Sequence, residues 1–141
     1  MNHKHIRATF FQVKNDPQKR EQIIQLAKEY FEKKEPLLIK LPHEKAIEYV
    51  DFLLWKHPKD SFLPHAIQDT PCQDLIVLTT SDENPNQARS ILNLCPKPVA
   101  NQDLFFYRIY ELEDLASTHK NKTAQDRYKY YREQGYTIIS Q

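Results

Sequence analysis

The chain of 141 residues contains a single glycine, Gly135, which lies close to the C-terminus. Loops that cradle phosphate groups, and the sharp turn that presents the nucleophilic serine of many hydrolases, need glycine at fixed positions. The G-x-G-x-x-G, P-loop and G-x-S-x-G motifs are therefore all missing. A nucleotide-dependent enzyme is disfavoured, and no cofactor is predicted.

Cysteine is also scarce, since the chain has only Cys72 and Cys95, each next to a proline. They form no C-x-x-C pair, so a zinc site has no framework. His3 and His5 could hold a metal ion weakly, but they have no third ligand nearby in the sequence. We expect two reduced structural thiols, buried or half-buried, and no metal site.

Long hydrophobic runs and an excess of charge of one sign are missing too. No apolar stretch approaches the ~20 residues that span a bilayer, and the N-terminus has no signal peptide. A cytoplasmic protein without a membrane partner is expected. The 20 Lys and Arg residues against 19 Asp and Glu give a net charge of +1. Any nucleic-acid-binding surface must therefore be local.

What the sequence does contain is an alternation of strand and helix patterns. Length and composition, with 40% hydrophobic and 28% charged residues, predict a single α/β domain over residues 1–141. Strands are expected at residues 6–13, 37–41, 74–80, 90–94 and 104–112, and helices at 17–34, between Pro42 and Lys56, and at 120–134. This order predicts three layers, with a mostly parallel sheet of about five strands and helices on both faces. Strand 90–94 is expected to pair with strand 74–80, and residues 56–71 to form a loop.

Few residues are candidates for catalysis. Residues 111–114, Glu-Leu-Glu-Asp, could supply carboxylates to a two-metal site, but an acidic group at a strand end is more often a solvated rim. His65 could act as a general base, yet no serine or cysteine nucleophile accompanies it in a known motif. A loop histidine with local hydrogen bonds is the stronger interpretation. No catalytic residue is predicted.

Aromatic residues cluster at the end of the second helix and beyond it. Trp55, the only tryptophan, lies among Lys56, His57 and Lys59, and Phe62 follows in a proline-rich segment. An aromatic residue bordered by charges at a loop edge is typical of interface hot spots. The alternative is a core plug that anchors the loop. Trp55 and Phe62 are the predicted partner-binding residues here.

The last helix carries the sharpest pattern. Its cationic stripe, spaced by three, four and three residues, comprises Lys122, Gln125, Lys129 and Arg132. A second stripe, about a quarter turn away, comprises Ala124, Tyr128 and Tyr131. A basic row beside an aromatic row suits an acidic peptide that carries an aromatic residue. A solvated basic face packed by tyrosines would give the same pattern.

Two segments resemble a known family. Residues 51–65, DFLLWKHPKDSFLPH, resemble the pattern D-x-x-L-W-x-x-P-x-x-S-F-x-P-H of the DNA polymerase III chi family. Residues 124–136, AQDRYKYYREQGY, resemble its C-terminal A-R-x-R-Y-[KR]-x-Y-R-x-x-G-[FY]. Both segments lie at the expected places, and the resemblance covers essentially the whole chain.

The resemblance implies a Rossmann-like domain without catalytic activity. Family members connect the clamp loader, through its psi subunit or an equivalent, to the acidic C-terminal tail of single-stranded-DNA-binding protein, which ends in Pro-Phe. Carried over, the tail site falls on Tyr128, Lys129 and, more loosely, Lys122. Gln125 departs from the pattern, because well-known members have an arginine there that pairs with the tail. Trp55 and Phe62 fall where the family binds psi or a helicase.

Two other classes of function stay open on the residues alone. One is a module that binds single-stranded DNA directly, with Tyr128, Tyr131 and the basic stripe as a stacking platform. The other is a nucleotide-binding or hydrolytic enzyme on a similar scaffold. Oligonucleotide titration and nucleotide-hydrolysis assays distinguish them from the adaptor.

Overall fold

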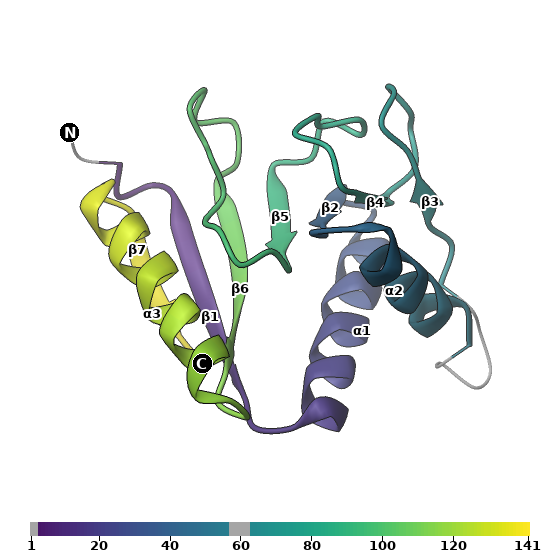
Figure 1. Cartoon of the computed structure of the whole chain (residues 1–141). Helices are drawn as coiled ribbons and strands as arrows, with labels where there is room; N and C mark the ends of the chain where they lie inside the picture. The colour runs from purple at the N-terminus through teal and green to yellow at the C-terminus, as the bar shows by residue number, and fades with distance from the viewer. Residues whose placement is uncertain (1–2, 57–62) are drawn as a thin grey trace.

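The computed structural model describes residues 3–56 and 63–141 and forms an α/β fold around a seven-stranded sheet (Figure 1). Phe62 lies outside the described residues. The elements in chain order are β1 (Arg7–Val13), α1 (Asp16–Lys33), β2 (Leu37–Lys40), α2 (Glu44–Lys56), β3 (Ala66–Ile67), β4 (Ile76–Thr79), β5 (Ser90–Asn93), β6 (Arg108–Asp114), α3 (Thr118–Glu133) and β7 (Thr137–Ser140).

The strands run parallel to one another in the order β3-β4-β2-β5-β6-β1-β7. The predicted parallel α/β class is confirmed, with seven strands in place of about five. The expected pairing of strand 90–94 with strand 74–80 is wrong, because β5 lies between β2 and β6. The two strands that the sequence did not indicate, β3 and β7, are the short edge strands of the sheet.

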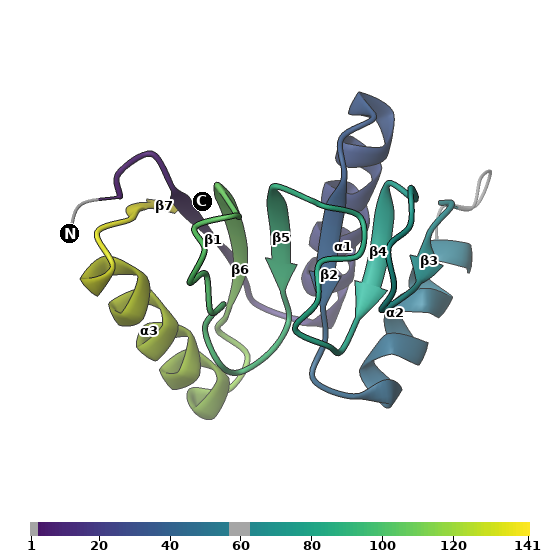
Figure 2. The same ribbon diagram turned by 90° about the horizontal axis from the view of Figure 1, so that it is seen from above.

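Two hydrophobic cores, one on each face, make the structure three-layered. α1 and α2 bury apolar side chains such as Ile23 and Val50 against one face, with Ile39 of β2 and Leu112 of β6. Ala8, Phe10 and Ile109 alternate to the opposite face and pack with Tyr131 of α3 and with loop residues. Seen from above, α3 lies by β1 and β7, and α1 by β2 (Figure 2). The predicted helices on both faces are confirmed.

Local capping explains where the helices begin and end. Asn15 caps α1, since its Oδ1 accepts a hydrogen bond of 2.9 Å from the backbone N–H of Gln18. Ser117 caps α3 in the same way. Gly135, with φ of 83°, takes the left-handed conformation that glycine permits and turns the chain from α3 into β7.

Strand β6 begins four residues later than the predicted start at residue 104. Leu104 has φ of 54°, which breaks the extended run. The side chain of Asn101 also holds the segment, because it donates to the carbonyl of Phe106 and accepts from its N–H. Residues 104–107 therefore form a clamped loop, and the alternation of Phe105 and Tyr107 is not part of a strand.

The two thiols are half-buried and free, as the sequence predicted. Burial raises the pKa of the Cys95 thiol above its ordinary value. Within residues 3–56 and 63–141, no helix is both long and apolar enough to cross a membrane.

Candidate protein-binding sites

A buried polar network beneath α3 fixes the helix on the sheet. Glu111 of β6 is fully buried, and its carboxylate accepts from Arg127 Nε at 2.7 Å and from Tyr131 Oη at 2.5 Å. Asn93 Nδ2 of β5 donates to the same carboxylate at 2.8 Å. The expectation that residues 111–114 form a solvated rim is wrong, because Glu111 and Asp114 are buried and Glu113 is half-buried. The side chain of Glu111 points to the α3 face of the sheet, where this network surrounds it.

Arg127 closes the network with its remaining N–H groups. They donate to the carbonyl oxygens of Pro96 and Leu112, both at 3.2 Å. The guanidinium therefore has hydrogen-bond acceptors inside the protein, which it needs because its side chain is only 8% exposed to solvent. Burial raises the pKa of Glu111 to about 7, and Arg127 and the neutral donors oppose that rise. Sequence reasoning missed Arg127. Its spacing of four from Tyr131 placed it on the buried side of the helix, which was the available signal.

The outer face of α3 has the opposite character. Lys122, Gln125, Lys129 and Arg132 are all exposed, whereas Ala124 and Tyr131 are buried against the sheet. The two stripes that the spacing predicted therefore differ in burial, and the stacking platform that was to include Tyr131 loses this ring, because Tyr131 is fully buried. The roles of the outer residues in binding stay a prediction.

Tyr128 lies at the border between the two stripes. Its ring is half-buried and packs against Phe10 of β1, with 5.7 Å between ring centroids. This position leaves part of an aromatic surface open directly beside Lys129. The outer face of α3 therefore offers a small apolar surface flanked by cations.

The end of α2 forms a second surface, built around His65. This imidazole has a side chain only 1% exposed, and its Nε2 and Nδ1 lie 2.6 Å from Asp51 Oδ1 and from the carbonyl oxygen of Leu63. Each ring nitrogen therefore has a hydrogen-bond partner. The interpretation of His65 as a locally hydrogen-bonded residue is confirmed. The arrangement ties the segment after residue 62 back to α2.

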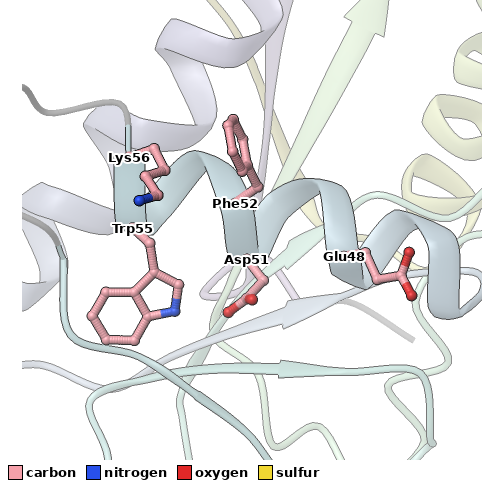
Figure 3. Close-up of a pocket in the computed structure, with 5 residues that line it drawn as sticks. All are labelled: Glu48, Asp51, Phe52, Trp55 and Lys56. Carbon is pink, nitrogen blue, oxygen red and sulfur yellow. The ribbon is translucent and has the colours of Figure 1, made fainter.

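Trp55 packs on this histidine, with 4.5 Å between ring centroids, and is 39% exposed. Trp55 and Asp51 leave α2 on one side, while Phe52 leaves on the other and is 61% exposed (Figure 3). Together with Glu48 and Lys56 they line a surface pocket of about 560 Å³. Asp51, Trp55 and His65 of the 51–65 segment thus meet in one place, and Phe52 of the same segment is exposed and not part of the core.

A second pocket, of about 390 Å³, opens at the carboxyl ends of β2, β5 and β6, between the helices of the two faces. Ligands of open α/β sheets commonly bind at this location. Its apolar lining includes Leu41, Pro42 and Leu94, and Lys19 and Lys120 add cationic side chains. Among the residues that the structure describes, no group of three or more His, Cys, Asp or Glu side chains could hold a metal ion.

The fold and these surfaces define a parallel α/β protein with exposed aromatic side chains on α2 and exposed cationic side chains on α3. The DNA polymerase III chi subunit, HolC, family model matches residues 6–139. The chain therefore belongs to the DNA polymerase III chi subunit family, an accessory subunit of the replicative polymerase. The comparison with curated proteins gave no match.

Proposed function

We propose that this chain is a non-catalytic adaptor of the DNA polymerase III holoenzyme. In this proposal α3 binds the acidic C-terminal tail of single-stranded-DNA-binding protein, and the end of α2 binds psi or another clamp-loader component, or a helicase. One observation carries it: exposed cations on α3 border a half-buried aromatic ring. The proposal also takes residues 1–141 as one domain.

The tail site needs two kinds of contact. Aspartates and the terminal carboxylate of the tail would meet Lys122, Lys129 and Arg132, which are exposed and close in helical spacing. The terminal phenylalanine would cover Tyr128, whose ring already rests on Phe10. Since exposed charges are screened beyond ~8 Å at physiological ionic strength, binding should weaken with salt.

Gln125 lies in the middle of the cationic stripe without adding charge. Its Nε2 is 3.5 Å from Asn121 Oδ1, which is a long and weak hydrogen bond on an exposed surface. An arginine could replace it without breaking a buried contact. Gln125→Arg is therefore a gain-of-function variant that should leave the fold intact.

The test is fluorescence anisotropy with a labelled acidic peptide that ends in Pro-Phe. Lys129→Ala should weaken binding about tenfold or more, because a charge-assisted hydrogen bond contributes ~1.5–3 kcal/mol. Gln125→Arg should tighten it. Lys45→Ala, an exposed lysine on α2, is the matched control and should have no effect. Unchanged binding for Lys129→Ala would remove α3 from the site.

Trp55 is proposed as the anchor for the clamp-loader partner. Truncation of such an anchor typically costs ~2 kcal/mol or more in binding. Trp55→Ala should therefore weaken capture of purified psi at least about thirtyfold. Tyr49→Ala on the same helix, 42% exposed, is the control. Equal losses for the two variants would contradict a specific role for Trp55.

The absence of catalysis in this proposal has support from the acidic residues. Glu111, the first carboxylate of the 111–114 group, already accepts three hydrogen bonds in the buried network. It has no approach from solvent for a metal-bound substrate. Purified protein should therefore leave DNA and nucleotides uncleaved, and cleavage lost on Glu113→Ala would contradict this.

A further inference from the structure

Four strands begin side by side at one edge of the sheet, called the amino edge here. Ser90, Arg108, Arg7 and Thr137 are register partners across β5, β6, β1 and β7. The residues just before them are therefore neighbours as well. Backbone hydrogen bonds join Tyr107 to the Arg89 carbonyl and Arg7 to the Tyr107 carbonyl, at 2.8 and 2.9 Å.

The side chains at the amino edge form a continuous row of planar groups. The Arg89 guanidinium lies over two rings, 4.4 Å from the centroid of Phe105 and 5.0 Å from that of Tyr107. The ring of His5 follows at 5.8 Å from Tyr107, and His3 at 6.1 Å from His5. The row thus extends over five side chains, of which Arg89, Tyr107 and His5 are exposed.

Two members of this row add little to the stability of the interior. Tyr107 is 43% exposed and Phe105 is half-buried. Among the described residues, the two hydrophobic cores include the neighbouring Phe106 but neither Phe105 nor Tyr107. Exposed rings held in place by an arginine are suited to contact another molecule.

Positive charge accompanies the row. Lys4, Arg7, Arg89 and Arg108 are all exposed and lie in or next to the strand starts. Glu35 is the acidic partner of Arg108, at 3.5 Å. The net charge of the whole chain is only +1, so this is a local basic surface on a nearly neutral protein.

We propose that the amino edge binds single-stranded nucleic acid without sequence preference. Unstacked bases would stack on Phe105, Tyr107 and His5, while the phosphates would contact the flanking cations. A duplex hides the faces of its bases, so a single strand should bind more tightly. None of the five side chains in the row belongs to α2 or α3.

The test is anisotropy of labelled oligo(dT), about 16 nucleotides long, at low salt. Tyr107→Ala should weaken binding about fivefold or more, whereas Tyr107→Phe should retain it. Arg89→Ala should lower the slope of log affinity against log salt by about 1. The control variants are Tyr49→Ala and Lys45→Ala, which remove an exposed ring and an exposed cation on α2.

Thermal unfolding of each variant shows whether the fold is intact. The acidic tail peptide should bind Tyr107→Ala as it binds the unchanged protein, which separates this proposal from the function of α3. The proposal would be overturned if oligo(dT) did not bind, or if the control variants lost as much oligo(dT) affinity as Tyr107→Ala. It would also be overturned if the acidic tail peptide displaced bound oligo(dT) from the protein.

Discussion

Replacing Arg127 by methionine removes the cation that pairs with the buried carboxylate of Glu111 at 2.7 Å. Three hydrogen bonds of the guanidinium disappear, to Glu111 and to the carbonyl oxygens of Pro96 and Leu112. Breaking a buried ion pair by removing one partner costs about 3–5 kcal/mol. The total free energy of unfolding of a domain of this size is about 5–15 kcal/mol. The loss is therefore a large part of the stability of the protein.

Urea unfolding followed by circular dichroism measures this change, and thermal unfolding should show Tm lower by roughly 10 °C. The matched control is Arg132→Met, an exposed arginine on the same helix, which should change the free energy of unfolding by less than about 0.5 kcal/mol. Without Arg127 the carboxylic acid favours its neutral form more strongly. The loss should thus be smaller at pH 5 than at pH 8. A loss below about 1 kcal/mol at pH 8 would refute the assigned role of the network.

The remaining predictions concern pH and capping. Because the folded pKa of Glu111, about 7, lies above its ordinary 4.5, the folded state holds a proton that the unfolded chain releases. The protonated Glu111 stabilises the folded state fully below pH 4.5, and this stabilisation, on the order of 3 kcal/mol, is lost as the pH rises to 7. In urea unfolding at several pH values, Glu111→Gln should flatten the dependence of the free energy of unfolding on pH. A free energy of unfolding that rises from pH 4.5 to pH 7 in the unchanged protein would contradict this assignment. Asn15→Ala should cost about 1 kcal/mol in the same assay because the N–H of Gln18 loses its cap; no loss would mean that water replaces the cap fully.

The sequence was most informative where one segment determines its own structure. The apolar run at β1, the cap at Asn15 and the glycine after α3 each act over a few residues, and each predicted element was found there. The two stripes of α3 followed from helical spacing alone, whereas the burial of Tyr131 depends on packing against β1 and β6 and was not predicted.

Features that depend on distant segments were not predictable from local patterns. Strand β5 pairs with β2 and β6 because of the crossovers of the whole sheet, which no local pattern encodes. The Glu111–Arg127 pair joins residues 16 apart whose partners also include Asn93. The row at the amino edge needs the register of several strands before Arg89 and Tyr107 become neighbours.

One titration tests whether the outer face of α3 binds the acidic tail, because it shows which residues of the protein contact the peptide. Uniformly ¹⁵N-labelled protein is titrated with a peptide that has an acidic stretch and ends in Pro-Phe. Amide shifts should concentrate at Lys122, Tyr128, Lys129 and Arg132, and they should vanish when the terminal phenylalanine is removed. Shifts confined to α2 or to the amino edge, or no shifts at low salt, would contradict binding of the tail at α3.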